Sequence, residues 1–400
     1  MPKAVVVGGG IGGLASGVAL RRKGWDVTVL ERAASIEPVG SGLAVAANAL
    51  KALDTLGLGD RVRELSTVEG ALGVRRSDGR WLVRTTEDRA DARYGDSVVV
   101  MLRATLMEVL MDALGPDALR LGTSVTGVDA GKGLVRTDAG EIEADLVVGA
   151  DGIRSATRQA LFPEHPGPAY SGVTTWRGLI PRNGLTIPRS ESWGRGLVFG
   201  IHELAGDVVY VYATDLAPAG AAHGDGREEL LRRFGGWHDP IPALLRAADP
   251  ARIIRNDVHY LKTPLPAFHH GRVALVGDAA HPMTPNLGQG ACQALEDAVV
   301  LAHVAGGDLA AYTAARLERT SKIVRQSMRI CSVTKVRNPL AVRLRDLGMS
   351  VAGRLSSDLM LRSMDEVLGW RPPAEPQPGP EAREQGRGPA WSGRGSGGPE

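Results

Sequence analysis

The chain of 400 residues is 43% hydrophobic, which is ample for a sizeable core and for about two to three domains. Its formal net charge is only +2 and no basic stripe is interleaved with aromatic residues, so the composition argues against nucleic-acid binding. Neither a secretory signal nor an apolar run long enough to span a membrane is present, and the two cysteines have no metal-ligand spacing. We therefore expect a cytoplasmic protein with no metal site and no disulfide.

The first elements have the pattern of a βαβ unit. Residues 3–10 (KAVVVGGG) begin as a buried strand, residues 11–24 continue as a helix of small residues that ends at Gly24, and residues 26–32 (DVTVLER) form a second strand. This order is typical of the opening of a doubly wound α/β sheet.

A glycine-rich loop joins the first strand to the helix. Gly8 permits the tight turn, Gly10 lets the backbone approach a pyrophosphate at the helix N-terminus, and Gly13 allows close packing of the helix on the strand. Glu31 closes the second strand eighteen residues after Gly13, where its carboxylate would accept hydrogen bonds from a ribose diol. These residues predict a dinucleotide site, and at this point NAD and FAD both remain possible.

The middle of the chain changes character. Residues 70–86 are typical of a β-hairpin with Asp78-Gly79 at its turn, residues 102–114 have helical apolar spacing, and residues 141–152 (EIEADLVVGADG) predict a further strand that runs into a turn. Residues 170–215 predict extended, β-rich segments. The fold class is therefore α/β, a Rossmann-like nucleotide domain with an inserted β-sheet domain and helices after residue 286.

A second loop late in the chain decides between the two cofactors. Asp278 follows a buried strand, where its carboxylate would accept hydrogen bonds from the ribityl hydroxyls that FAD has and NAD lacks. Pro285 fixes the chain before Gly288, Gln289 and Gly290, whose amides can point at a flavin ring, and the following helix N-terminus favours negative charge there. Because only one dinucleotide motif is present, both loops must serve one FAD.

Three motifs in order, "GGGIGG" with Glu31, "ADGIRSATR" and "GDAAHPMTPNLGQG", resemble the single-component FAD-dependent aromatic hydroxylases of the para-hydroxybenzoate hydroxylase fold. The resemblance covers residues 3 to about 370. It implies that Asp151 contacts FAD and NAD(P)H and that Arg103 lies near the FAD pyrophosphate. We assign Arg32, next to Glu31, to the cofactor site as well.

The domain boundaries follow from this resemblance. We expect an FAD-binding domain, a β-rich substrate domain, C-terminal helices and a disordered Pro/Gly-rich tail. The FAD-binding domain would comprise residues 1–69, 87–165 and 266–335, and the substrate domain would comprise residues 70–86 and 166–265. The C-terminal helices would span residues 336–371, and the tail would span residues 372–400.

The branch that the chain most resembles holds urate hydroxylases, salicylate hydroxylases and zeaxanthin epoxidases. In the urate enzymes an arginine and a tyrosine on adjacent strands face the flavin, and Arg195 and Tyr210 fall where those residues would lie. They are our candidates for substrate orientation or phenol deprotonation. His281 is more typical of a histidine that fastens its loop than of a base.

The reaction implied by the resemblance is a monooxygenation. NADPH or NADH visits transiently and reduces FAD, O2 adds to give a C4a-hydroperoxyflavin, and one oxygen atom passes to an aromatic or polycyclic small molecule. Olefin epoxidation by the same kind of enzyme and O2-independent alkene reduction on the same fold stay open as alternatives, as does a flavoprotein that only sequesters a ligand. We expect a small-molecule substrate and a monomer or homodimer.

Overall fold

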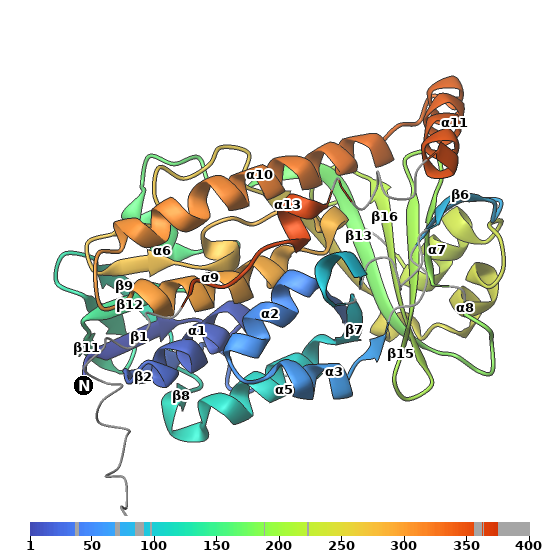
Figure 1. Cartoon of the computed structure of the whole chain (residues 1–400). Helices are drawn as coiled ribbons and strands as arrows, with labels where there is room; N and C mark the ends of the chain where they lie inside the picture. Colours follow the sequence, from blue (N-terminus) through green and yellow to red (C-terminus); the bar gives the residue numbers. More distant parts are fainter. Residues whose placement is uncertain are drawn as a thin grey trace, which may run out of the picture.

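The computed structural model describes residues 1–36, 40–68, 73–84, 92–96, 98–187, 189–221, 224–355, 362 and 364–374 (Figure 1). Two sequence predictions lie partly outside these residues, namely the ends of the 70–86 hairpin segment and residues 375–400 of the tail. Within the described residues a mainly parallel sheet with helices lies beside a larger, mostly antiparallel sheet, which confirms the predicted α/β class with an added β-sheet region.

The first sheet carries the glycine loop. Its strand order is β18 (His269–His270), β19 (Val273–Leu275), β12 (Leu146–Gly149), β1 (Lys3–Val7), β2 (Asp26–Leu30), β8 (Leu119–Arg120). β1 pairs in parallel with β2 and with β12, as the predicted βαβ unit requires, and α1 (Ile11–Arg22) is the connecting helix.

Both faces of this sheet are covered. Val6 of β1 packs among the helices on one face, whereas Val5 and Val7 pack against a small sheet on the other. The helices include α1, α5 (Arg103–Leu114) and α9 (Gly290–Val304), and the small sheet consists of β9 (Val125–Asp129), β10 (Leu134–Thr137) and β11 (Gly140–Glu143). Burial on both faces explains the uninterrupted valine run of β1.

One strand prediction is wrong. Residues 141–152 form two strands in different sheets, β11 and β12. The chain bends between them because the Ala144 amide donates to the Gly133 carbonyl oxygen (2.9 Å) and the Asp145 amide donates to the Lys3 carbonyl oxygen (2.9 Å). These two bonds pull consecutive residues toward separate sheets, which a run of strand-forming residues does not reveal.

The second large sheet has the strand order β17 (Ile254–Tyr260), β13 (Ala169–Pro181), β16 (Val208–Leu216), β15 (Val198–Leu204), β14 (Ser190–Trp193), β5 (Gly73–Arg76), β6 (Trp81–Arg84). The described part of the predicted hairpin is β5 and β6, with Gly79 at φ +87° in the turn. Helices α7 (Gly226–Phe234) and α8 (Ile241–Ala247) cover one face through a core that includes Trp176 and Phe199. The other face turns toward the first domain.

A third, smaller sheet lies where the two regions meet. It consists of β3 (Gly42–Val45), β7 (Val99–Leu102) and β4 (Thr67–Val68), and it leads into α2 (Ala47–Thr55), α3 (Gly59–Glu64) and α5. Val100 of β7 packs with Leu204 and Tyr210 of the seven-stranded sheet. This contact brings the sheet face that carries Tyr210 against the domain that carries the glycine loop.

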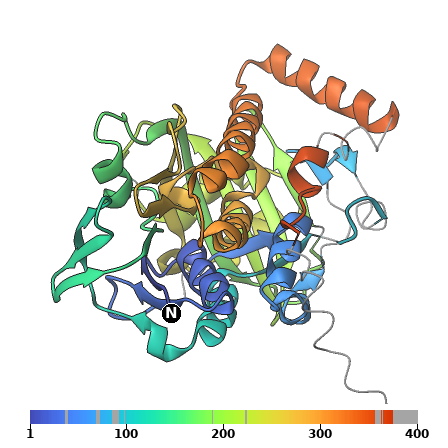
Figure 2. The ribbon, with the colours of Figure 1, turned by 60° about the vertical axis from the view of Figure 1, so that its left-hand side comes forward.

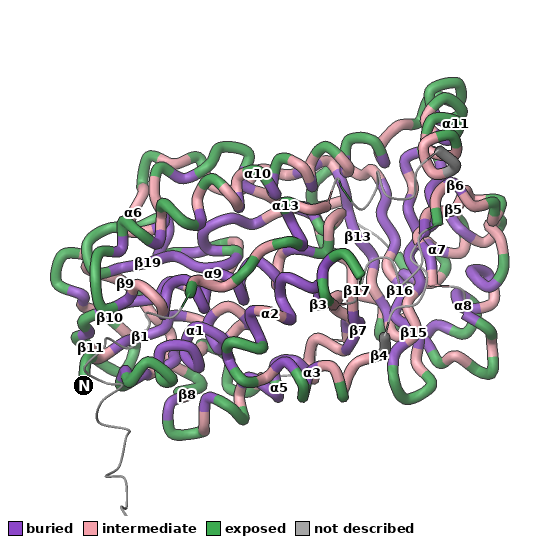
Figure 3. Tube along the Cα trace, viewed as in Figure 1, coloured by how far each residue is buried: buried purple, intermediate pink, exposed green. Residues whose placement is uncertain are grey.

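The C-terminal helices join the two regions. Helix α10 (Ala310–Thr334) buries Tyr312 in the core of the first domain and Cys331 against Val173 and Val258 of the second sheet. Helix α11 (Pro339–Leu355) packs one face on β6 and extends from the body as an arm, while α13 (Asp365–Leu368) returns to the first domain (Figure 2). The tube coloured by burial shows that much of α11 is exposed (Figure 3). Among the helices that the structure describes, none combines the length and apolarity needed to cross a bilayer.

Candidate active site

The glycine loop is closed on its inner side and open at Gly10. A Cβ added at Gly8, whose φ is +109°, would stand 2.5 Å from the Ala150 carbonyl oxygen, and one at Gly13 would stand 1.9 Å from the Gly8 carbonyl oxygen. A Cβ added at Gly10 would meet no heavy atom within 4 Å. The backbone therefore packs tightly below the loop and leaves free space beside Gly10, at the N-terminus of α1.

The Glu31 carboxylate braces this loop. Its Oε2 accepts a hydrogen bond from the Gly9 amide (2.8 Å) and its Oε1 accepts one from the Ala33 amide (2.9 Å). Arg32 is exposed beside it. The predicted ribose-binding acid thus also holds the glycine loop against the end of β2.

The Asp151 carboxylate has a structural task as well. It accepts hydrogen bonds from the Thr157 amide and hydroxyl (both 2.9 Å) and from the Ser155 hydroxyl, at the start of α6 (Ala156–Leu161). Arg158 of this helix donates to the carbonyl oxygens of Ala279 (3.0 Å) and Ile153 (2.6 Å). The "ADGIRSATR" motif therefore ties α6 to the second predicted loop.

Asp278 lies among cationic side chains. Its side chain is accessible to solvent, and no described residue donates a hydrogen bond to its carboxylate. Surrounding protein desolvates the carboxyl and raises its pKa, whereas the positive charges of His281, Arg103, Arg158 and Arg177 oppose that rise. Within the described part of the chain, neither the Arg103 nor the Arg177 guanidinium has a hydrogen-bond or ion-pair partner. This group of residues therefore offers unused cations and one unused carboxylate.

The second loop presents its backbone and buries its polar side chain. Pro285 and Gly288 are exposed, and Gly288 adopts φ +62° beside Ala44 of β3. The Gln289 side chain is buried, and its Oε1 accepts hydrogen bonds from Asn48 Nδ2 (3.0 Å) and Gln293 Nε2 (3.0 Å). A Cβ added at Gly290 would meet nothing within 4 Å, so the backbone there borders open space at the start of α9.

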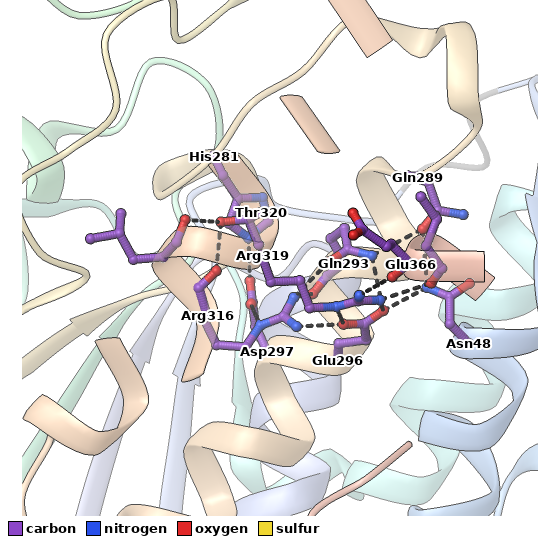
Figure 4. A network of polar contacts seen from close by, with 12 residues as sticks. Asn48, His281, Gln289, Gln293, Glu296, Asp297, Arg316, Arg319, Thr320 and Glu366 are labelled. Carbon is purple, nitrogen blue, oxygen red and sulfur yellow. Dashed lines mark hydrogen bonds and ion pairs between the residues drawn. The ribbon is translucent and has the colours of Figure 1, made fainter. Parts of the chain in front are cut away.

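A buried network of charged groups holds this loop from below (Figure 4). Arg316 of α10 donates through Nε to Asp297 Oδ1 (2.6 Å), and it also pairs with Glu296. Asp297 Oδ2 accepts hydrogen bonds from the Gly277 amide (2.8 Å) and from His281 Nε2 (2.6 Å). The network therefore fixes both ends of the turn that carries Asp278, and His281 fastens its loop as the sequence predicts.

The acidic members of the network stay ionised at neutral pH. Burial alone would raise the pKa of the Asp297 carboxyl, but the adjacent positive charges of His281 and Arg316 lower it to about 2. Burial likewise raises the pKa of Glu296, and the stronger effect of Arg316 and Arg319 lowers it overall. Sequence reasoning missed these residues, and the one available signal was a Glu-Asp pair inside an apolar helix, where charges need partners.

Arg177 belongs to the seven-stranded sheet and is close enough to Asp278 and Arg103 to influence their charges. Four side chains on its face of that sheet form what we call the sheet wall: Arg177, His202, Tyr210 and Tyr212. Arg177 on β13 pairs in register with Tyr212 on β16, and His202 on β15 pairs with Tyr210. The His202 ring lies 5.7 Å from the Tyr212 ring and 6.2 Å from the Tyr210 ring, between centroids. All four residues therefore share one face of the sheet.

Tyr210 contacts the first domain directly. A Cβ added at Gly42 of β3 would stand 2.4 Å from its Cδ1, so only glycine lets the ring lie this close. Its hydroxyl has no partner among the described residues. Burial raises the pKa of Tyr210 and the Arg177 charge opposes this. By contrast, the Tyr212 hydroxyl donates to Glu191.

The structure does not place Arg195 next to Tyr210, the other member of the expected pair. Arg195 is exposed in the turn between β14 and β15, beyond Val198, and Val198 pairs with Thr214. Thr214 is four residues from Tyr210 along β16, which corresponds to about 13 Å. The cation on the face that carries Tyr210 is Arg177, which pairs in register with Tyr212 and is therefore a diagonal neighbour of Tyr210.

A glycine loop at a helix N-terminus, a cationic cluster with a free carboxylate and an aromatic sheet wall define a flavoprotein of the hydroxylase type. The family model described as FAD binding domain matches residues 2–200 and 254–327. The chain is 41% identical over 366 residues (88% of it and 94% of the relative) to a Stigmatella aurantiaca protein named aurachin C monooxygenase/isomerase. It is 33% identical over 359 residues (84% and 90%) to an FAD-dependent urate hydroxylase of Mycolicibacterium vanbaalenii.

Among solved structures, Klebsiella pneumoniae HpxO complexed with FAD and uric acid superposes with a TM-score of 0.83 at 28% identity, covering 92% of this chain and 96% of that one. The chain belongs to the FAD binding domain family. It is an FAD-dependent monooxygenase, with FAD as its cofactor and NADPH or NADH as the transient electron donor. The predicted recognition and fold are thereby confirmed.

Proposed function

We propose that the enzyme hydroxylates an aromatic small molecule that carries an acidic N–H or O–H group, held between the flavin ring and the sheet wall. The observation that supports this most is the pair of unused polar groups on the wall, the Arg177 guanidinium and the Tyr210 hydroxyl. A cation near a phenol in a partly desolvated site stabilises negative charge that develops on a bound ring.

Residues of the first domain would hold the cofactor. The open backbone at Gly10 would receive the pyrophosphate at the N-terminus of α1, with Gly8 and Gly13 shaping the loop. The free carboxylate of Asp278 would accept hydrogen bonds from ribityl hydroxyls. Further contacts would come from Glu31 and Arg32 to the adenosine half, from Arg103 and Asp151 near the phosphates, and from Pro285, Gly288, Gln289 and Gly290 to the flavin ring.

The chemistry divides between the cofactor and the wall. Bound FAD, reduced by NADPH or NADH, supplies one oxygen atom of O2 to the substrate, and the other oxygen atom leaves as water. Tyr210 remains a neutral phenol at neutral pH because burial raises its pKa, so it can donate a hydrogen bond to a substrate oxygen or nitrogen. The Tyr212 hydroxyl donates to Glu191, which holds its ring in place on the wall.

Names of relatives suggest which compounds to test first. The matched proteins are named for aurachin C and for urate, and the chain covers most of each. The aromatic side chains of the wall suit a flat ring that stacks beside them. We therefore propose these two compounds as initial ligands.

We propose two functional regions, with the flavin bound by the first sheet and its helices and the substrate bound by the seven-stranded sheet.

Cys292 and Cys331 are both free and buried, which supports the reducing environment of the cytoplasm. The oligomeric state, a monomer or a homodimer, stays a prediction.

The test combines ligand titration with reaction coupling. Flavin absorbance is titrated with each compound, and hydroxylated product is then compared with NADPH or NADH consumed. We expect Arg177→Ala to weaken ligand binding about tenfold with flavin content unchanged, the loss of one charge-assisted contact. An unchanged ligand affinity would contradict the proposed wall. Product formed without O2 would indicate an alkene reductase, and an epoxide product would indicate the epoxidase alternative.

A further inference from the structure

Helix α11 exposes an apolar stripe along its whole length. Leu340, Leu344, Leu347 and Val351 are 65%, 62%, 62% and 45% exposed. Their spacing of four, three and four residues places them on one side of the helix. Four large exposed apolar side chains in a row are unusual on a protein surface and mark a surface that contacts something else.

The opposite side of α11 is anchored to the protein. Val342 and Asp346 are buried, and Asp346 forms an ion pair with Arg345 (2.8 Å). Arg345 also donates to the Gly194 carbonyl oxygen (3.3 Å). The stripe therefore lies on the side of α11 away from these anchoring contacts. Figure 2 shows α11 extending from the body of the molecule.

Exposed cations without a described acidic partner lie on the two helices. From Arg319 to Arg345 the sequence has eight basic residues and no acidic residue, and four of the eight form ion pairs with acids elsewhere in the chain, namely Arg319, Lys322, Arg337 and Arg345. Arg325 and Arg329 are exposed on α10, and Arg343 is exposed on α11 next to Leu344. Helices α10 and α11 together form one edge of the molecule in Figures 1 and 3. Val333, near the end of α10, adds a further exposed apolar side chain.

We propose that this edge, the outer side of α11 with the exposed end of α10, docks on the surface of a lipid bilayer that contains anionic headgroups. The stripe would enter the headgroup region while the arginines contact the headgroups, as in helices that lie in the membrane plane. A second copy of the chain fits less well, because symmetric pairing of two stripes brings the Arg343 cations of both copies toward one another, and the described part of α11 has no exposed acid to offset them.

The experiment is flotation of the FAD-loaded full-length protein with vesicles of phosphatidylcholine, with or without phosphatidylglycerol. We expect binding only to the anionic vesicles, weakened by added salt. Leu344→Ser with Leu347→Ser should lower the partition coefficient at least about tenfold, with exposed Leu121→Ser as the matched control. Arg329→Ser with Arg343→Ser should lower it by about fivefold per arginine, with exposed Arg61→Ser and Arg232→Ser as controls.

Several outcomes would overturn the proposal. One is no binding to either vesicle at low salt, and another is stripe variants that bind as well as Leu121→Ser. A third is a wild-type dimer, detected by light scattering, that becomes a monomer when the stripe residues are substituted. That result would show that the stripe binds a second copy of the chain. Flavin absorbance of each variant verifies folding, and because no turnover is measured, the result is independent of the proposed substrate.

Discussion

The two sides of the proposed site are built in opposite ways. On the proposed cofactor side, charged side chains such as Asp297 and Arg316 are buried and paired with one another, and they hold the backbone of the loop. On the proposed substrate side, the strand ladders hold the backbone, and the Arg177 guanidinium and Tyr210 hydroxyl have no partner among the described residues. Substitutions on the first side should therefore affect the free energy of unfolding and flavin binding, and those on the second side should affect substrate binding and turnover.

Arg316→Met should have the largest effect. It leaves Glu296 and Asp297 buried without their main counter-charge, and breaking a buried ion pair from one side costs about 3–5 kcal/mol of unfolding free energy. Urea unfolding of the apoprotein measures this loss of unfolding free energy. Arg319→Met, on a partly exposed neighbour that also contacts Glu296, is the matched control and should cost less. Equal unfolding free energies for the two variants would show that the network does not brace the cofactor side.

Gly10→Val separates cofactor binding from folding. Gly10 has φ −76° and an added Cβ meets nothing, so the apoprotein should fold with its normal melting temperature. The new side chain would occupy the space proposed for the pyrophosphate, and FAD affinity should fall at least about a hundredfold, or about 2.7 kcal/mol. Flavin fluorescence during dialysis measures the affinity. A purified variant that stays yellow would place the pyrophosphate elsewhere.

Asp297 should govern part of the acid sensitivity. Because its folded pKa is lowered to about 2, its contribution to stability is full above the unfolded value near pH 4 and is lost as pH falls toward 2. That contribution is roughly 2 kcal/mol. Asp297→Asn should abolish this part of the acid limb in pH-dependent unfolding, whereas Asp117→Asn, at an exposed position, should leave the limb in place. Identical acid limbs in wild type and Asp297→Asn would contradict the network's charge state.

Arg177→Ala and Arg195→Ala form the sharpest comparison on the substrate side. The first should lower the ratio of product formed to NADPH or NADH consumed about tenfold, near 1.4 kcal/mol, because it removes the cation near Tyr210. The second should leave that ratio unchanged, since Arg195 is exposed in a distant turn. The reverse pattern would restore Arg195 as the substrate arginine.

Some features of the fold and site were predictable from short segments. The glycine loop, Glu31 and the loop from Asp278 to Gly290 act through backbone shape and local position, so their spacing alone identifies an FAD site within a βαβ unit. Tyr210 became a candidate through the resemblance to the urate enzymes, and its role stays a prediction. The single strand expected at 141–152 was wrong because hydrogen bonds to Gly133 and Lys3, remote in the sequence, divide it between two sheets.

The sequence by itself determined the fold class and the cofactor, because glycine spacing and valine runs constrain the backbone wherever they occur, and the resemblance of its motifs to a known family indicated the kind of reaction. Only the tertiary structure decided that Arg177 and not Arg195 is a diagonal neighbour of Tyr210, and that Arg316 neutralises an acid pair nineteen or more residues away. Those choices depend on strand register and on helix packing, which place side chains from separate segments in contact and leave no mark on the segments themselves.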